Sequence, residues 1–385
     1  METVDLETGE IGIDWTKAPR LAKCSWRIGS TVPVHAANGF AHYSGTERCS
    51  SIWSCPVCSS VIRAERAREI AQAVTAHQEA GGSALFLTLT IRHKRRDPLR
   101  QSLDAVLKSW QSMLRATAWG GGKRQMGMKE RYGVIGYIRS TEVTYGYNGW
   151  HPHIHAIILT ENDLSEDMIK RFGDEVHGLW SSRVEKRTGR LPTRDAGVDV
   201  QKVDTDGKVL SKYISKMQDE GSRTKTEKWG VSAELARADV KAARIKGSSV
   251  PFEFLDQDHE YDAPRRHALW AEYVEGTRGR RAITWSRGLK DLYKIDELTD
   301  EEIIEETESA PARWLAYGKG YDALRRRDAG LLAHVLDLAE IEAWTEVAAL
   351  LPGEPAPDFD LPDDDPPEEP RVRTERENDD HDPAE

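Results

Sequence analysis

The segment 150–159, WHPHIHAIIL, constrains the fold of this chain most, because it places histidines at every second position of an apolar run. Alternate residues of a strand share one face, so His151, His153 and His155 would point the same way. Imidazoles are costly to bury without partners and are common ligands of first-row divalent cations. The alternative is a pair of exposed surface histidines on an edge strand, which the apolar run 156–159 disfavours. The pattern therefore indicates a metal site on a buried strand.

A β-hairpin supplies a third candidate ligand. Asn148-Gly149, typical of a type I′ turn, joins the histidine strand to a second predicted strand at 133–145. If these two residues form the loop, Glu142 lies opposite His155, with Cβ atoms about 5 Å apart. Two imidazoles and a carboxylate (His153, His155, Glu142) suit Mn²⁺ or Mg²⁺ bound to a phosphate. A slip of one residue in the pairing would turn Glu142 to the opposite face.

Periodicity predicts further elements around this hairpin. In ALFLTLTIRH, Leu85, Leu87 and Leu89 alternate with Phe86 and Thr88, which predicts a strand. Apolar spacing predicts helices at about 59–82, 99–118, 163–186, 207–218, 231–246 and 264–276, and a helical region after 296.

A tyrosine falls on the inner face of the predicted helix 207–218. Tyr213 shares that face with the apolar residues Val209, Leu210, Ile214 and Met217. Lys212 and Lys216 flank it, and nearby cations favour the phenolate, which is the nucleophilic form. An inward tyrosine beside lysines is more often a core residue, so its interpretation as a nucleophile depends on the histidine strand.

The net charge of −11 is concentrated at the C-terminal end. The stretch 354–385 holds 14 Asp/Glu and 3 Arg, whereas the rest of the chain holds 51 residues of each sign. Residues 60–131 hold 14 Lys/Arg against 6 Asp/Glu, which indicates phosphate binding, although a solvated helical face has a similar composition. The DNA-binding candidates are Arg63, Arg66, Arg92, Lys94, Arg95 and Lys212.

All four cysteines lie in the first 58 residues: Cys24, Cys49, Cys55 and Cys58. The C-P-V-C turn is typical of a zinc knuckle, and a four-thiolate structural Zn²⁺ site is the favoured interpretation. His35 or His42 could replace Cys24. Unliganded thiols, or a redox C-x-x-C, are the remaining alternatives.

Three motifs taken together resemble a known family. FLTLT, HPHIH and KYISK, in this order and spacing, resemble the motifs of rolling-circle replication initiators, the Rep proteins of the HUH endonuclease superfamily. The resemblance is closest to initiators of actinobacterial plasmids and spans roughly residues 24–293. Any one motif alone would be a weak match.

The resemblance implies a fold and a reaction. The fold is α+β, a ferredoxin-like antiparallel sheet with the histidine strand at its centre. His153 and His155 are then the paired metal ligands, and Tyr213 is the nucleophile that becomes linked to the 5′ phosphate of nicked, unpaired origin DNA. Some relatives carry a water-activating glutamate four residues before the tyrosine, where this chain has Val209. Host helicase and DNA polymerase are the expected partners.

These predictions divide the chain into a flexible leader (1–20), a cysteine-rich zinc module (21–62) and an HUH nicking-joining domain (63–295) with a helical insertion around 222–280. A helical region (296–352) and an acidic, disordered tail (353–385) follow. No apolar run approaches the roughly 20 residues of a membrane span, and the N-terminus lacks an apolar signal core, so a cytoplasmic protein is expected. A transposase or relaxase of the same superfamily, and a zinc-containing DNA-binding regulator without nuclease activity, are the competing functions.

Overall fold

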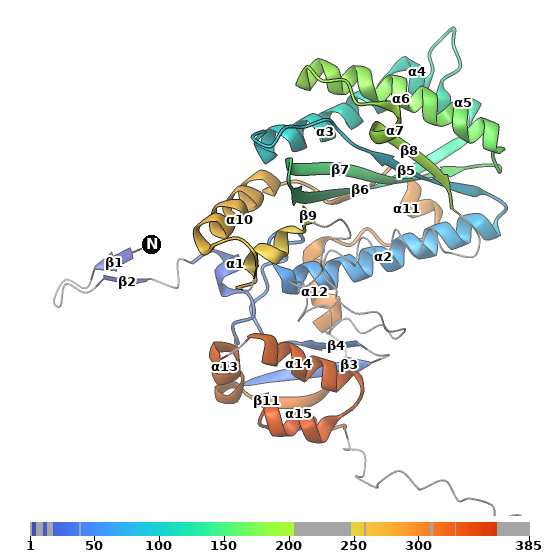
Figure 1. Ribbon diagram of the computed structural model, residues 1–385. Coiled ribbons are helices and arrows are strands. Elements are labelled where there is room, and N and C mark those ends of the chain that lie inside the picture. Colours follow the sequence, from blue (N-terminus) through green and yellow to red (C-terminus); the bar gives the residue numbers. More distant parts are fainter. Residues whose placement is uncertain are drawn as a thin grey trace, which may run out of the picture.

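The computed structural model describes residues 2–4, 11–13, 18–37, 40–203, 248–257, 259–308, 311–327 and 329–359. This part of the chain folds into helices and antiparallel sheets, which confirms the mixed composition predicted from the sequence (Figure 1). One sheet has six strands and another has four. Within the predicted leader, β1 (Glu2–Val4) pairs with β2 (Ile11–Ile13).

The histidine strand is the central strand of the six-stranded sheet. The strand order is β10-β6-β7-β5-β8, with β9 beside β6, and every pair is antiparallel. The strands are β5 (Ser83–Leu89), β6 (Val134–Gly146), β7 (Gly149–Thr160), β8 (Val198–Lys202), β9 (Ser248–Ser249) and β10 (Ile283–Trp285). Because β7 pairs on both sides, the edge-strand alternative is wrong.

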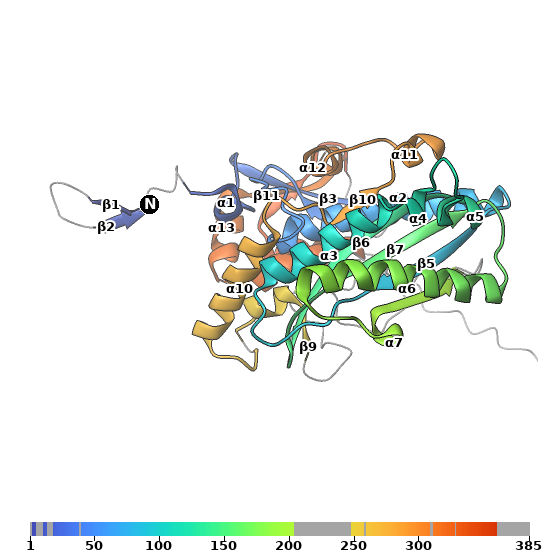
Figure 2. The same cartoon turned by 90° about the horizontal axis from the view of Figure 1, so that it is seen from above.

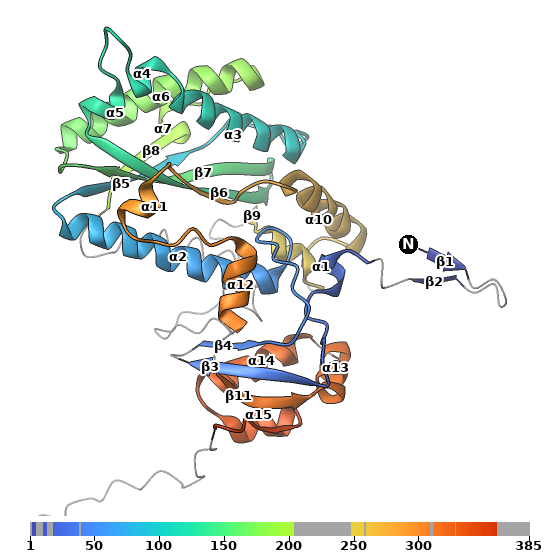
Figure 3. The ribbon, with the colours of Figure 1, turned by 180° about the vertical axis from the view of Figure 1, so that it is seen from behind.

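Helices cover both faces of this sheet. α3 (Leu99–Leu114) and α6 (Glu166–Thr188) lie side by side on one face, where Leu87 belongs to the core beneath them (Figure 2). α2 (Pro56–Glu79) runs along the opposite face (Figure 3), where Ile157 of β7 packs in one core cluster with residues of α2. The odd-numbered histidines of β7 continue the series of Ile157, so they lie on the α2 face.

The β6–β7 hairpin differs from its predicted register. Gly146 pairs with Gly149, so Tyr147 and Asn148 form the two-residue turn, and neither has a positive φ. The type I′ prediction is therefore wrong, because that turn needs positive φ at both central residues. Gly149 follows at φ 85°, and a Cβ there would lie 2.6 Å from the carbonyl oxygen of Arg95.

Moving the turn by one residue shifts every cross-strand pair by two, which preserves the face of each side chain. Glu142 pairs with His153, instead of the predicted His155, and Ser140 lies opposite His155. Since side chains alternate with a period of two, Glu142 remains on the face of the histidines.

The four-stranded sheet joins distant parts of the sequence. Its order is β12-β11-β3-β4, and β3 pairs antiparallel with β11. The strands are β3 (Thr31–Ala37), β4 (Phe40–Tyr43), β11 (Ala312–Tyr317) and β12 (Gly353–Pro355). Three helices pack on it: α13 (Gly318–Arg327), α14 (Ala329–Glu340) and α15 (Trp344–Leu350). Figures 1 and 3 show this second unit below α2 and α12 (Asp300–Glu308).

This second unit corrects three predicted boundaries. Residues 31–43 pair with 312–317, so the segment 21–62 is not a separate module. The region 296–352 contains β11 and is not purely helical, and β12 falls inside the stretch predicted to be disordered from 353 onward. A local pattern does not reveal a pairing between strands almost 300 residues apart. The predicted helices at 207–218 and 231–246, and residues 360–385 of the tail, lie outside the described residues.

Shorter elements complete the described chain. They are α1 (Arg20–Lys23), α4 (Thr117–Gly120), α5 (Met128–Arg131), α7 (Arg194–Gly197), the 3₁₀ helix η2 (Pro251–Leu255), α10 (Ala263–Thr277), α11 (Leu289–Leu292) and α12 (Asp300–Glu308). α10 matches the helix predicted at 264–276. None of the helices in the described ranges combines the length and apolarity that a bilayer crossing requires.

Candidate active site and cysteine cluster

Glu142, His153 and His155 meet on the α2 face of the six-stranded sheet. Oε2 of Glu142 lies 2.8 Å from Nε2 of His153 and 2.8 Å from Nε2 of His155, and the two nitrogens are 3.1 Å apart. Adjacent ligands of an octahedral ion with bonds of about 2.1 Å would lie about 3 Å apart. The spacing of the three atoms therefore fits a small divalent cation.

Hydrogen bonds fix the orientation of both imidazoles. Nδ1 of His153 lies 3.2 Å from the carbonyl oxygen of His151, which can only accept, so Nδ1 carries the proton. Nδ1 of His155 lies 3.1 Å from Oγ1 of Thr88, and its ring stacks on Phe86. Metal-binding histidines are commonly held through the second nitrogen in this way, which leaves Nε2 directed at the ion.

The electrostatics of the site keep the carboxyl group ionised. Burial raises the pKa of Glu142, but the charges and hydrogen bonds of His153 and His155 outweigh this effect, and its pKa lies well below the ordinary value. A carboxylate and two imidazole nitrogens that converge on one point attract a cation, whether a proton or a metal ion. The side chains are 19%, 11% and 5% exposed for Glu142, His153 and His155, so the site is shielded but not closed.

A fourth histidine near the centre was missed by the sequence analysis. Nε2 of His93 lies 2.8 Å from Nδ1 of His151, and Nδ1 of His93 lies 3.0 Å from the carbonyl oxygen of Asn148. Desolvation lowers the pKa of His151 to about 4. His93 lies in the basic segment IRHKRR that follows β5, and its contacts with the β6–β7 hairpin are not visible from the local sequence.

The loop 90–97, which follows β5 and contains His93, carries several basic side chains. Arg92, Lys94 and Arg95, predicted to contact DNA, are all exposed. Arg190 pairs with Asp97 and ties the end of the loop to the segment after α6. The loop thus presents positive charge beside the histidine centre.

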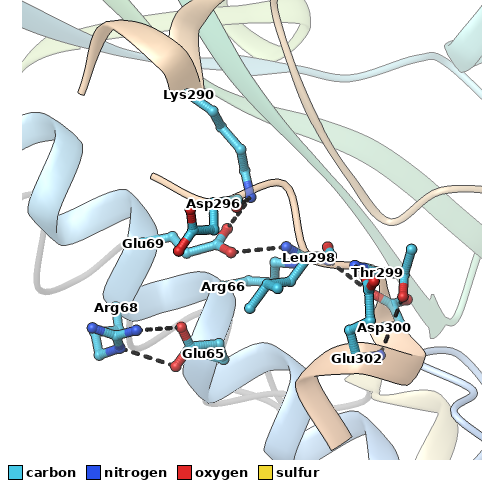
Figure 4. A network of polar contacts seen from close by, with 10 residues as sticks. All are labelled: Glu65, Arg66, Arg68, Glu69, Lys290, Asp296, Leu298, Thr299, Asp300 and Glu302. Carbon is cyan, nitrogen blue, oxygen red and sulfur yellow. Dashed lines mark hydrogen bonds and ion pairs between the residues drawn. The ribbon is translucent and has the colours of Figure 1, made fainter. Parts of the chain in front are cut away.

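Two other predicted DNA contacts are engaged within the protein. Arg63 is buried, donates from Nε to Oγ of Ser59 at 3.0 Å, and lies over the ring of Trp53. Arg66 donates to Glu69 at 2.9 Å and to Asp300 at 3.0 Å, in the network that joins α2 to α12 (Figure 4). These arginines stabilise the protein interior, and their prediction as DNA contacts is corrected accordingly. A count of local charge does not distinguish exposed cations from buried ones.

The predicted nucleophile Tyr213 and its neighbours Lys212 and Lys216 lie outside the described residues. Val203, which directly follows β8, is the last described residue before this stretch, and the described chain resumes at Ser248 beside Gly146 of the hairpin. Both ends of the stretch therefore belong to the sheet that carries the histidines.

The four cysteine sulfurs form a compact cluster. Sγ of Cys24 lies 3.4 Å from Cys55 and 3.6 Å from Cys58, and Sγ of Cys49 lies 3.8 Å from Cys58. All four sulfurs lie within 4.8 Å of one another. Bonds of about 2.3 Å to a tetrahedral zinc ion place sulfurs about 3.8 Å apart, so the cluster fits that ion.

Contacts among the cysteines shift their pKa values in opposite directions: those of Cys24 and Cys58 are lowered and those of Cys49 and Cys55 are raised. Hydrogen bonds from Cys49, Cys55 and Cys58 hold the pKa of the Cys24 thiol below its ordinary value. Cys55 also caps the N-terminus of α2, where its sulfur accepts from the backbone N–H of Cys58. The alternative ligands His35 and His42 stack on each other in the four-stranded sheet and are not part of the cluster.

A family model and a curated relative place this chain in one family. Residues 42–316 match the family model described as a replication protein. The chain is 34% identical over 317 residues to the Streptomyces lividans protein named Protein rep. The match covers 69% of this chain and 68% of that protein. A stretch of 145 residues is 40% identical to a Streptomyces cyanogenus protein named Neomycin resistance protein, covering 33% of each chain. No solved structure matches.

Proposed function

The chain belongs to the replication protein family, as its resemblance to Rep initiators of actinobacterial plasmids predicts, and we propose that it nicks and rejoins one strand of origin DNA. The observation that carries this proposal is the convergence of Glu142, His153 and His155 on one buried strand face. A replication protein that only bound DNA would not need two imidazoles and a carboxylate within 3.1 Å of one another.

The proposed catalytic ion is Mn²⁺ or Mg²⁺, held by Glu142, His153 and His155. When bound, such an ion polarises the scissile phosphate and offsets negative charge that develops on it. Thr88 and the backbone of His151 hold the imidazole rings in the orientation that directs Nε2 toward the ion. The six-stranded sheet would then be an HUH core of ferredoxin-like type, an assignment supported by the central position of β7.

Tyr213 is the proposed nucleophile, and this assignment rests on the KYISK motif. Its phenolate oxygen forms a bond to phosphorus while the bond from phosphorus to the 3′ oxygen breaks. The 5′ end stays attached as a phosphotyrosine, and the 3′ oxygen takes up the proton that the phenol loses. Lys212 and Lys216 favour the phenolate. The reverse reaction rejoins strands without ATP, because the tyrosyl ester keeps the bond energy.

The DNA contacts and partners follow from this reaction. Arg92, Lys94 and Arg95 would bind phosphates of the unpaired strand, and a Zn²⁺ ion held by the four cysteines would fix the N-terminal end of α2. The freed 3′-OH would prime a host DNA polymerase, with a host helicase opening the duplex. Val209 stands where some relatives carry a water-activating glutamate, so termination would have to use another group.

The experiment incubates the full chain with labelled single-stranded fragments that tile its plasmid's candidate origin, in the presence of Mn²⁺. We expect one fragment to form a covalent protein–DNA adduct that survives denaturation. Tyr213→Phe removes only the attacking oxygen, so it should abolish the adduct and keep DNA binding. An adduct that persists in Tyr213→Phe would reject this nucleophile, and wild type that binds every fragment without an adduct would support a DNA-binding regulator.

A further inference from the structure

The turn of the β6–β7 hairpin carries a solvent-exposed aromatic side chain, Tyr147. Tyr147 is 82% exposed, the largest value among the large apolar side chains of the described residues. A tyrosine ring offers a large apolar surface, and an exposed ring on a firm support is typical of a binding surface. Neither the metal centre nor the predicted nucleophile uses Tyr147.

The support beneath Tyr147 is rigid. The preceding Tyr145 is buried and contacts the rings of Trp150 and Phe254 edge-on, with centroids 4.9 and 5.8 Å away. β9 pairs with the end of β6, at Tyr145 and Gly146. A ring on such a support loses little conformational freedom when it binds a partner, which increases affinity.

A cation accompanies the ring. Cζ of the exposed Arg95 lies 5.8 Å from the centroid of Tyr147. The backbone of Arg95 approaches Gly149 so closely that a side chain there would collide with it, and His93 bonds the carbonyl oxygen of Asn148 at 3.0 Å. The basic loop and the hairpin turn are therefore fixed to each other, and ring and guanidinium form one surface.

Side-chain contacts link this surface to the histidine centre. Tyr147 directly follows β6 and is five residues from Glu142, a separation of at most about 17 Å at 3.4 Å per residue. His93 contacts His151, whose ring centroid lies 5.2 Å from that of His153. A DNA strand with a phosphate at the metal centre would pass the turn within a few nucleotides.

We propose that Tyr147 and Arg95 form a stacking platform for an unpaired base of the DNA strand that is cut at the histidine centre. The proposal rests on the proposed nicking function. Every base has an aromatic face, and stacking on a protein ring contributes about 1–3 kcal/mol per base with little sequence preference. Arg95 adds attraction to the phosphates and to the π-system of the base. In duplex DNA the faces are already stacked, so the platform selects single strands.

The test compares two probes with the same backbone: a fluorescein-labelled 20-nucleotide oligo(dT), and a 20-nucleotide strand of abasic residues. Binding is measured by fluorescence anisotropy in the full-length Tyr213→Phe chain without added Mn²⁺ or Mg²⁺, so that no cleavage occurs. Tyr147→Ala should weaken oligo(dT) binding about 10-fold, because it removes one stacked base. It should change binding of the abasic strand less than about 2-fold, because phosphate contacts remain.

Two variants control this comparison. Tyr147→Phe should bind oligo(dT) like the parent, because stacking does not need the hydroxyl. Tyr317→Ala removes another exposed tyrosine, 47% exposed on the four-stranded sheet, and should change neither probe. Equal affinities of Tyr147→Ala and its parent for oligo(dT), or equal losses on both probes, would overturn the platform. Adduct formation by wild type is scored separately, so failure of the platform and failure of the nicking proposal are distinguishable.

Discussion

The histidine centre and the cysteine cluster are two groups of side chains with the spacing of metal ligands, and the chain assembles them in different ways. Glu142, His153 and His155 come from the two neighbouring strands of one hairpin, and their positions follow from the alternation of a sheet. The cysteines come from loops and from the start of α2, so their positions follow from contacts between separate segments. The ladder hydrogen bonds of the sheet hold the first group, whereas the second depends on loops that pack against α2 and its neighbours.

The two groups also differ in their donor sets. Four thiolates complete a tetrahedron and leave no position for a substrate, which is typical of structural zinc. Two imidazoles and a carboxylate leave positions for water and phosphate oxygens, which is typical of a catalytic ion. Loss of zinc should therefore destabilise the region around the cysteine cluster, whereas loss of the catalytic ion should inactivate the histidine centre without unfolding it.

The largest effect should come from the cysteine cluster. Cys55→Ser removes a thiolate and should release zinc, lowering the free energy of unfolding by about 3 kcal/mol or more, because structural zinc contributes about 10 kcal/mol in small domains. The measurement is the zinc content per chain together with thermal unfolding. His153→Ala serves as the matched variant and should keep both values. If the wild-type protein contains no zinc after purification under reducing conditions, the four cysteines do not form a structural zinc site.

The next effect concerns catalysis at the histidine centre. Glu142→Gln keeps the shape of the side chain but removes the charge, so single-turnover nicking should slow by at least about 100-fold, more than outer-shell changes cost. Thermal unfolding and zinc content should stay as in wild type. Thr144→Val, two residues along the same strand face, should change the rate by no more than about 2-fold. Nicking by Glu142→Gln at the wild-type rate would exclude the carboxylate as a ligand.

A smaller effect tests how the imidazoles are oriented. Thr88→Val is close in shape and removes the hydroxyl that lies 3.1 Å from Nδ1 of His155. Mn²⁺ affinity should fall by about 10-fold, as for other partners of metal-bound histidines. Titration calorimetry measures the affinity, and the number of zinc ions per chain is the control. Unchanged Mn²⁺ affinity would mean that packing against Phe86 alone orients the ring.

The smallest effect concerns the loop beside the histidine centre. The hydrogen bond from Arg190 holds the pKa of Asp97 below its ordinary value, so the ionised carboxylate is more stable in the folded protein than in the unfolded chain. The pair therefore stabilises the protein above pH 4 and loses its contribution as the pH falls through the lowered pKa. Because the pair is partly exposed, Asp97→Asn should cost at most about 1 kcal/mol at pH 7. Denaturant unfolding should show a smaller difference from wild type at pH 3 than at pH 7. A difference of equal size at both values would point to a role of shape instead of charge.

The local pattern predicted the histidine centre well and its surroundings poorly. Alternation placed His153, His155 and Glu142 on one face even though the turn was misassigned, because moving a two-residue turn preserves the parity of the pairing. Thr88 and His93 were not identified as neighbours, since their contacts with β7 depend on pairing between separate strands and loops.

The four-stranded sheet, in contrast, could not be predicted from a local sequence pattern. The strands 31–37 and 312–317 are short and lie far apart in the sequence, so nothing near either of them predicts its partner. The same limit explains Arg63 and Arg66, which look like exposed cations by charge but face Trp53 and Asp300 in the fold. Which residues share a strand face is a local property, whereas burial and long-range pairing depend on the whole chain.

The most direct test of the central claim is a Mn²⁺ titration of the zinc-loaded full chain, followed by electron paramagnetic resonance. We expect one Mn²⁺ site per wild-type chain, no such site in the double variant His153→Ala/His155→Ala, and the same zinc content in both proteins. Mn²⁺ bound with unchanged stoichiometry and affinity by the double variant would contradict the assignment of the histidine centre as the metal site.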